Sequence, residues 1–207
     1  MNDRLPAAPI AQTVRANEAA ILNAALGAFG EQGFNGASMR EVAKRAGTSL
    51  SNLYNYFPSK DHLLGEVLRR ANAELAARLH RAVAEAGDDA SSRLREAVRA
   101  YVGFVVDHQL AMLVSTAEVR YLRGPERDRL VAERDRTQAI VSGIVEQGVA
   151  SGEFRTPHAA DAGRAILSML NAVASWYRPD GRLSRGQLAE QHARYALALL
   201  EAPLAHR

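Results

Sequence analysis

The stretch "SMREVAKRAGTSLSNLYNYFPSK", residues 38–60, contains two short helical patterns separated by a turn that includes a glycine. Ser38 followed by Glu41 is a capping-box pattern, which predicts the start of the first helix. Gly47 ends that helix, and Pro58 prevents the second helix from continuing. Two short helices at this spacing form a helix-turn-helix pattern.

The predicted motif covers residues 38–57. Its second helix enters the major groove of DNA with polar side chains toward the base edges. Asparagine pairs with adenine, serine donates or accepts, and leucine contacts the thymine methyl group. The side chains predicted to face bases are Leu50, Ser51, Asn52 and Asn55. Hydroxyl and basic groups around them are predicted to reach phosphate oxygens, namely Ser38, Arg40, Lys44, Thr48, Ser49, Tyr54, Tyr56 and Lys60.

The aromatic cluster in this stretch has a second interpretation. Tyr54, Tyr56 and Phe57 can all be core residues, since core is the commoner use of aromatic side chains. The capped helix, the turn and the polar face together favour DNA contact for the two tyrosines and a core position for Phe57. Lys60 supports this reading, because a lysine at a helix start opposes the helix dipole unless it meets an anion.

The composition narrows the class of protein. The chain has 207 residues, of which 47% are hydrophobic, and this is enough for a substantial helical domain with a small one attached. It has no cysteine, so disulfides and thiolate zinc sites are excluded. No apolar run approaches the roughly 18 residues of a bilayer span, and the first residues lack signal-peptide features. We expect a soluble cytoplasmic protein without membrane contact, cofactor or metal.

Helical composition continues beyond the motif, and an all-α fold is therefore expected. Alanine, leucine, arginine and glutamate dominate, and no stretch shows the two-residue alternation of a half-buried strand. A long helix follows Ser59, and a break is predicted at residues 86–92. Further helices are predicted over about 93–107, 110–122, 125–150, 158–178 and 184–201. Residues 1–14 read as a flexible arm, and the charged run at 123–136 reads as a solvated helix face.

Three stretches carry a resemblance to a known family: "ILNAALGAFGEQGF" (21–34), "SMREVAKRAGTS" (38–49) and "LYNYFPSKDHLL" (53–64). Residues 15–70 resemble the DNA-binding domain of the TetR (tetracycline repressor) family of bacterial transcriptional regulators. Thr48 stands where valine is common and Leu50 where a polar residue is common, which affects operator preference. The resemblance implies a homodimer of nine-helix subunits with an N-terminal three-helix DNA-binding domain. It also implies a C-terminal domain that binds a small effector and releases DNA.

We accordingly predict a DNA-binding domain over residues 15–77 and a ligand-binding and dimerisation domain over 78–207. The apolar stripes in residues 159–177 and 188–200 are consistent with a four-helix bundle between two subunits, with ordinary core as the alternative. Polar or aromatic groups within apolar helices are candidate effector contacts. These candidates, each also compatible with core or surface positions, are Tyr101, Phe104, His108, Glu118, Tyr121, Asn171, Trp176 and Arg178.

The segment "WYRPDGRLS", residues 176–184, resembles a subgroup of TetR-like repressors in actinobacteria and their relatives. Several members of that subgroup respond to acyl-CoA thioesters. The resemblance implies that Trp176 packs on an acyl chain while nearby arginines meet a CoA phosphate.

Two other function classes are compatible with a helical chain. A helical enzyme is disfavoured, because no nucleophile elbow, phosphate-binding glycine loop or dinucleotide fingerprint is present. His158 with Asp161 is the close histidine–carboxylate pair to consider for a metal, and two ligands are a weak metal signal. An architectural DNA-binding protein without effector would not need so large a C-terminal part. We therefore expect a ligand-responsive transcriptional repressor that acts on double-stranded operator DNA and is not an enzyme.

Overall fold

The computed structural model describes residues 8–202, with side chains described from residue 17 onward. All regular structure in this part is helical, as expected, and it comprises nine α-helices and one 3-10 helix. They are α1 (Ala8–Gly36), α2 (Met39–Arg45), α3 (Leu50–Tyr56), α4 (Lys60–Ala84), α5 (Ala90–Asp107), α6 (Gln109–Glu118), η1 (Val119–Tyr121), α7 (Gly124–Ser151), α8 (Ala159–Trp176) and α9 (Arg185–Leu199).

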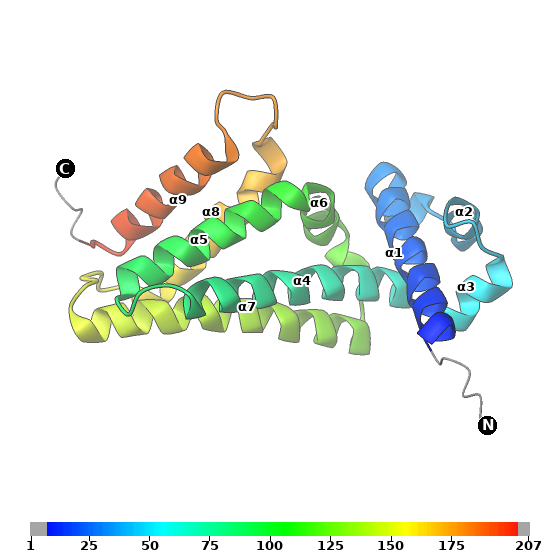
Figure 1. The fold of residues 1–207 in the computed structure, drawn as a ribbon, viewed down its shortest axis with the longest axis horizontal. Coiled ribbons are helices and arrows are strands. Elements are labelled where there is room, and N and C mark those ends of the chain that lie inside the picture. The colour runs from blue at the N-terminus through cyan, green and yellow to red at the C-terminus, as the bar shows by residue number, and fades with distance from the viewer. Residues whose placement is uncertain (1–7, 203–207) are drawn as a thin grey trace, which may run out of the picture.

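Helices α1, α2 and α3 form a small unit at one end of the molecule (Figure 1). The Ser38 hydroxyl accepts a hydrogen bond from the Glu41 amide at 3.2 Å and caps α2, as predicted. The capping box is not closed, however, because the Glu41 carboxylate accepts hydrogen bonds from Gln32 and Arg45 instead. The turn before α3 contains Gly47 with φ 66°, a left-handed conformation that glycine adopts without strain.

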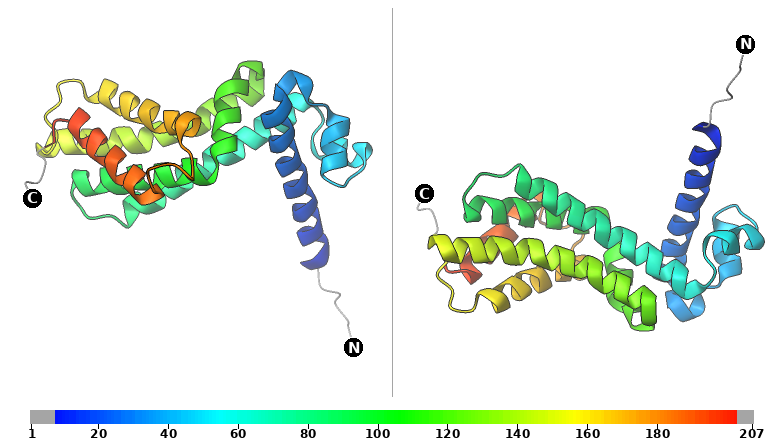
Figure 2. Two further views of the ribbon diagram at one scale, coloured as in Figure 1. Left: turned by 90° about the horizontal axis from the view of Figure 1, so that it is seen from above. Right: turned by 90° about the horizontal axis from the view of Figure 1, so that it is seen from below.

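The N-terminal boundary of α1 differs from the prediction. Residues 8–14 were expected to belong to a flexible arm, yet they form the first turns of α1, and residues 1–7 lie outside the described part. Pro9 is compatible with this helix start, because backbone N–H groups in the first turn have no helical acceptor. These turns project away from the other helices (Figure 2).

Helix α4 leaves the small unit and runs along the C-terminal half without a break (Figure 1). Residue 77, the predicted domain boundary, lies inside this helix, so the division at that point stays a prediction. Ion pairs hold α4 to its neighbours on both sides. Arg70 pairs with Glu18 of α1, and Arg69 lies 3.7 Å from Glu133 of α7.

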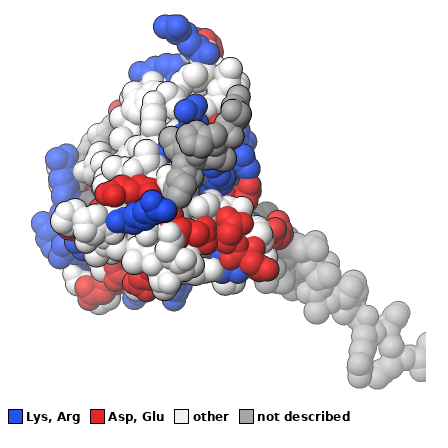
Figure 3. Space-filling view, turned by 90° about the vertical axis from the view of Figure 1, so that its left-hand side faces the viewer, with Lys and Arg blue, Asp and Glu red and all other residues white. Residues whose placement is uncertain are grey.

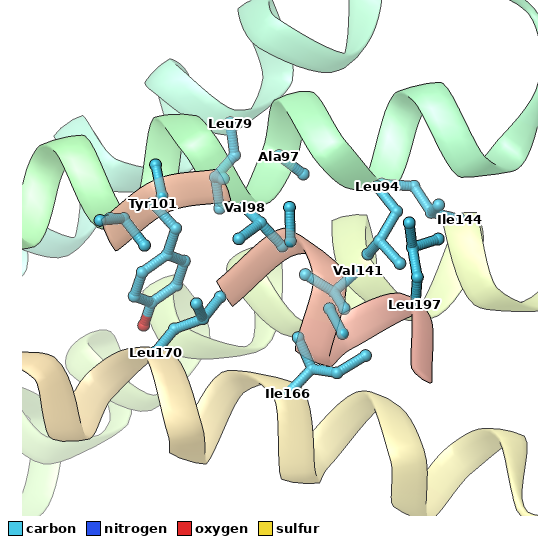
Figure 4. Close-up of a cluster of buried hydrophobic side chains, with 14 of the residues drawn as sticks. Leu79, Leu94, Ala97, Val98, Tyr101, Val141, Ile144, Ile166, Leu170 and Leu197 are labelled. Carbon is cyan, nitrogen blue, oxygen red and sulfur yellow. The ribbon is translucent and has the colours of Figure 1, made fainter. Parts of the chain in front are cut away.

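The C-terminal half is built around a core shared by α4, α5, α7, α8 and α9. Leu94 and Val98 of α5, Val141 of α7 and Ile166 of α8 are almost fully buried and point toward one another (Figure 4). No single helix within residues 8–202 has the length and apolar composition of a membrane span. Helix α5 and the following α6–η1 segment pass that test only as a pair, and this pair is bent by 87°.

Candidate DNA interface and ligand cavity

Helix α3 exposes one polar face and buries the opposite one. Leu53 is 0% exposed and Phe57, directly after the helix, is 2% exposed, which confirms the core position predicted for Phe57. Ser51, Tyr54 and Asn55 are exposed, Tyr54 to 45%. Among the described residues none of these three side chains has a hydrogen-bond partner, so their polar atoms are available to another molecule.

Other predicted base contacts are partly engaged within the protein. The side-chain amide of Asn52 donates a hydrogen bond to the Thr48 hydroxyl at 2.8 Å, and both side chains are half-buried. The Ser49 hydroxyl caps α3 by accepting a hydrogen bond from the backbone N–H of Asn52 at 3.0 Å. Leu50 and Tyr56 are half-buried against the core of the small unit. A role of these residues in DNA recognition stays a prediction, with Ser51 and Asn55 the more accessible pair.

The basic residues of α2 fall into two groups. Arg40 and Lys44 are exposed and take part in no ion pair among the described residues. Arg45 instead lies 2.8 Å from Glu31 and 2.6 Å from Glu41. Hydrogen bonding from Arg45 holds the pKa of the Glu31 carboxyl below its ordinary value. Of the basic residues of α2, Arg40 and Lys44 are therefore free to meet phosphate.

Lys60 has a structural role that the sequence did not indicate. Its ammonium donates hydrogen bonds to the backbone carbonyl oxygens of Phe34 at 2.7 Å and Ala37 at 3.0 Å. The same nitrogen lies 4.4 Å from the centroid of the Phe34 ring. These contacts join the start of α4 to the end of α1 and explain a lysine at a helix start without any anion. The third N–H group of the Lys60 ammonium has no hydrogen-bond partner among the described residues, so a phosphate contact of Lys60 stays a prediction.

A surface hollow of about 720 Å³ connects several of these side chains. It is lined by Asn35, Gly36, Ala37, Ser38, Met39, Arg40, Leu50, Tyr54, Pro58, Ser59 and Lys60. Five predicted DNA contacts thus share one surface of the small unit. At the opposite end of the molecule, acidic and basic side chains are interspersed (Figure 3). Among the described residues, the face drawn in Figure 3 is therefore not uniformly basic.

A second cavity, of about 500 Å³, lies in the C-terminal half among α4 to α8. Its wall consists of Asn72, Leu75, Tyr101, Met112, Ser115, Thr116, Val119, Arg134, Thr137, Gln138, Arg164, Leu167, Ser168 and Asn171. Tyr101 and Asn171 are the two predicted effector contacts in this wall, and the Tyr101 hydroxyl donates to Asn171 Oδ1 at 2.8 Å. Burial raises the pKa of Tyr101 above its ordinary value, so the hydroxyl stays protonated.

The wall also contains polar residues that the sequence analysis missed. Arg134 Nη2 donates hydrogen bonds to the Ser115 carbonyl oxygen and to Ser115 Oγ, both at 3.0 Å. Burial lowers the pKa of Arg134 below its ordinary value. Thr137 is 5% exposed, and its hydroxyl has no hydrogen-bond partner among the described residues. The wall therefore combines a few apolar side chains with many polar ones, among them two arginines and a threonine with an unsatisfied hydroxyl.

The reading of residues 123–136 as a solvated face is wrong in part. Glu133 is only 6% exposed, and Arg134, although exposed, donates hydrogen bonds to Ser115 of α6. The reason is that α7 lies between α4 and α8 and is covered on more than one side. Alternating charges at helical spacing do not reveal such packing.

Two of the predicted effector contacts join α6 and η1 to the small unit instead of lining the cavity. The Glu118 carboxylate is buried and accepts a hydrogen bond from the Phe34 amide at 3.0 Å. The Tyr121 ring stacks on Phe34 with centroids 5.0 Å apart, and its hydroxyl accepts from Asn35 Nδ2 at 3.1 Å. The end of α6 is thus fastened to the end of α1.

The four other predicted effector contacts also lie outside the cavity wall. Phe104 and His108 stack on each other with ring centroids 4.4 Å apart. Trp176 is 47% exposed and stacks on a buried histidine of α9, while Arg178 donates to a backbone carbonyl beside it. Effector contact by these four residues stays a prediction.

The pair considered for a metal is also engaged elsewhere. Asp161 forms an ion pair with Arg164, three residues away. Over the described residues, no group of three or more histidine, cysteine, aspartate or glutamate side chains is placed to hold a metal ion.

Comparison with known proteins covers both halves of the chain. The family described as bacterial regulatory proteins, tetR family, matches residues 21–67, and the tetracyclin repressor-like C-terminal domain matches residues 87–200. The transcriptional repressor KstR2 of Rhodococcus jostii (strain RHA1) is 26% identical over 88% of this chain and 90% of its own.

Solved structures agree with these matches. PfmR, a TetR family regulator from Thermus thermophilus, is 30% identical with a TM-score of 0.77, over 90% of this chain and 99% of that one. AibR, crystallised with isovaleryl coenzyme A and operator DNA, has the same fold at 21% identity and a TM-score of 0.79, over 90% and 100% of the two chains. One family match covers the helix-turn-helix unit, and the other covers more than half of the sequence. This chain therefore belongs to the TetR family of bacterial transcriptional regulators.

Proposed function

We propose that the protein is a homodimeric transcriptional repressor that binds operator DNA through α2 and α3 and releases it when a small ligand occupies the cavity. The DNA-binding residues are those predicted from the sequence, with Ser51 and Asn55 facing bases and Arg40 and Lys44 facing phosphates. The DNA-binding part corresponds to residues 15–77 and the ligand-binding part to 78–207.

The observation that carries this proposal is that one helix, α6, contacts both the cavity and the small unit that contains α2 and α3. Met112 and Ser115 of α6 line the cavity, and Glu118 at the end of the same helix accepts a hydrogen bond from Phe34 of the small unit. A ligand that binds more tightly when α6 is displaced would shift the orientation of α1 and α4, and hence of the reading helix. A ligand with equal affinity for both positions would shift nothing.

The proposed effector is an acyl-CoA thioester or a similar ligand with a long apolar part. The cavity volume of about 500 Å³ lies in the ordinary range of small-molecule sites. Leu75, Met112 and Leu167 give it apolar surface for an acyl chain, while the arginines can meet a polar head group. The structural similarity to AibR, which was crystallised with isovaleryl coenzyme A, supports this ligand class.

The proposed dimer forms through α8 and α9. Trp176 and Tyr195 are each 47% exposed and Leu199 is 43% exposed, which is unusual for large apolar side chains on helices that also contribute to the core. A groove of about 600 Å³ runs beside Tyr195 on α9. Tyr195→Asp should shift sedimentation toward the monomer at micromolar concentration, whereas Tyr54→Asp on α3 should leave the dimer intact. A wild-type monomer would reject this part of the proposal.

The experiment that tests the whole proposal is a fluorescence anisotropy titration with duplex DNA flanking the protein's own gene. It is repeated with isovaleryl-CoA, octanoyl-CoA and stearoyl-CoA, and with free coenzyme A as control. We expect saturable DNA binding that at least one thioester weakens. Binding that no metabolite affects would favour an architectural DNA-binding protein, and absence of binding to duplex DNA would reject the proposal.

A further inference from the structure

We infer that Arg134 binds the anionic group of the effector and, in doing so, gives up its hydrogen bonds to Ser115 of α6. The release of Ser115 is the step that reports ligand binding to α6. The inference rests on the proposed function of the cavity and adds the chemical class of ligand and the residue that detects it. The ligand would be an amphipathic anion, with a carboxylate or phosphate attached to an apolar body.

The first observation is that the charge of Arg134 is uncompensated. On the same helix, Arg129 pairs with Glu126 at 3.1 Å and Arg136 pairs with Glu133 at 2.8 Å. Arg134 takes part in no ion pair within residues 17–202 and donates to neutral acceptors of Ser115. A guanidinium forms shorter and stronger hydrogen bonds with carboxylate or phosphate oxygens than with neutral ones. An incoming anion is therefore a better partner than Ser115.

The second observation is the unsatisfied hydroxyl next to this cation. Thr137 follows Arg134 by three residues on α7, so both side chains lie on one side of the helix. Thr137 lines the same cavity, and its buried hydroxyl has no hydrogen-bond partner among the described residues. Buried polar groups are normally hydrogen-bonded. A two-oxygen head group bound by Arg134 can accept from this hydroxyl as well.

The other arginine of the wall lacks these properties. Arg164 of α8 lines the cavity but already pairs with Asp161. It has no hydrogen bond to α6 among the described residues. Arg164 is consequently a natural control, because it has the same charge in the same cavity without the contact to α6.

The contacts along α6 explain how this exchange of partners affects DNA binding. At its start, Gln109 Nε2 donates to the carbonyl oxygens of Ala174 at 2.7 Å and Tyr177 at 3.0 Å, which fixes this end to α8. In the middle, Ser115 is held by Arg134 of α7. When an anion binds Arg134, the middle of α6 loses its hydrogen bonds to α7 while the start of α6 stays fixed to α8. The part that moves includes Glu118, which holds the small unit.

The first test compares two probes of equal chain length, octanoate and 1-octanol, by isothermal titration calorimetry. Wild-type protein should bind octanoate at least about tenfold more tightly than the alcohol. Arg134→Gln should lose this preference, and Arg164→Gln should keep most of it. Absence of octanoate binding, equal affinity for the two probes, or an unchanged preference in Arg134→Gln would each overturn the inference.

The second test asks whether the anion displaces Ser115 from Arg134 or only binds beside it. Ser115→Ala removes one of the two acceptors that compete for Arg134, so octanoate should bind a few-fold more tightly. Thr116→Ala is the matched control, because Thr116 also lines the cavity but its hydroxyl donates to the Met112 carbonyl and does not touch Arg134. Weaker octanoate binding in Ser115→Ala, or an equal gain in Thr116→Ala, would contradict the exchange.

The third test measures the mobility of α6 directly. Hydrogen exchange of the amides in residues 115–121 should become faster in Arg134→Gln than in wild type or Arg164→Gln, and octanoate should produce the same change in wild type. Unchanged exchange in Arg134→Gln would reject the role of Arg134 in holding α6. If acyl-CoA thioesters fail to release DNA but these three results hold, the proposed effector is wrong and the inference about Arg134 stands.

Discussion

The exposed face of α3 and the wall of the cavity both carry polar side chains, and the two regions differ in whether those side chains are hydrogen-bonded to other helices. Ser51 and Asn55 contact no other polar group among the described residues, whereas Tyr101, Asn171 and Arg134 are all hydrogen-bonded within the C-terminal half. The outward groups can change without disturbing the fold, so DNA preference can change one residue at a time. A substitution of Arg134 in the cavity wall instead alters ligand binding and the attachment of α6 together.

The largest expected effect comes from the buried side of α3. Leu53→Ala removes a side chain that is 0% exposed, and large-to-small core substitutions cost about 2–5 kcal/mol. Thermal unfolding should show a lower melting temperature and DNA binding should be lost at 37 °C. Ser51→Ala on the outward side should change the free energy of unfolding by less than about 0.5 kcal/mol. Equal stability of the two variants would contradict the assignment of the two faces.

Substitution of the outward groups should affect DNA binding and leave stability unchanged. Asn55→Ala should reduce discrimination between operator and mismatched DNA by about 1–3 kcal/mol, because a base contact is lost. Arg40→Ala should weaken binding to all sequences alike and reduce the salt slope by about 1. Anisotropy titrations at several salt concentrations measure both quantities. An undiminished sequence preference in Asn55→Ala would place the base contacts on other residues.

Glu118 connects the two regions, and its removal should uncouple them. Glu118→Leu deletes the acceptor of the Phe34 amide, a loss worth about 1–3 kcal/mol for a buried hydrogen bond. The variant should still bind the effector in calorimetry but no longer release DNA on binding it. Glu118→Gln keeps an acceptor oxygen and should retain the response. Full release of DNA from Glu118→Leu would mean that coupling uses another contact.

The smallest effect concerns the ion pairs that Glu66 forms with Arg69 and Arg70 within α4. Although burial opposes it, hydrogen bonding from Arg69 and Arg70 lowers the pKa of Glu66 to about 2. A carboxyl with a lowered folded-state pKa contributes stability that is present above its unfolded value near 4.5 and is lost as pH falls toward about 2. The contribution is at most about 1 kcal/mol, because Arg70 is partly exposed.

Urea unfolding of wild type and Glu66→Gln at neutral pH and at about pH 3 measures this contribution. The stability difference between the two proteins should shrink at the lower pH. A constant difference would show that Glu66 does not titrate in this range.

The helix-turn-helix unit was predictable because its signals are local. Ser38 and Ser49 cap α2 and α3, Gly47 permits the turn, and Pro58 ends α3, so the chain itself limits these helices. The later helices were also located within a few residues, since their apolar periodicity is strong. The start of α1 was missed because prolines near the N-terminus suggested an arm, although proline is compatible with a first helical turn.

The cavity wall was harder to predict because its residues are defined by tertiary contacts. Arg134 resembles its charged neighbours in sequence, and only the position of α6 gives it Ser115 as a partner. Lys60 had an unusual position for its charge, but the carbonyl oxygens that explain it lie more than 20 residues earlier in the chain. Thr137 gave no signal at all, since a threonine in a long helix is common.

Binding-site selection from random duplex DNA tests the central claim, that the outward face of α3 reads DNA as one half of a symmetric pair. Wild-type protein should enrich a palindrome whose half-sites are about 34–36 Å apart or somewhat wider, and Asn55→Ala should enrich a sequence altered at one position in each half. Enrichment of no sequence, or of the same palindrome by both proteins, would contradict the claim.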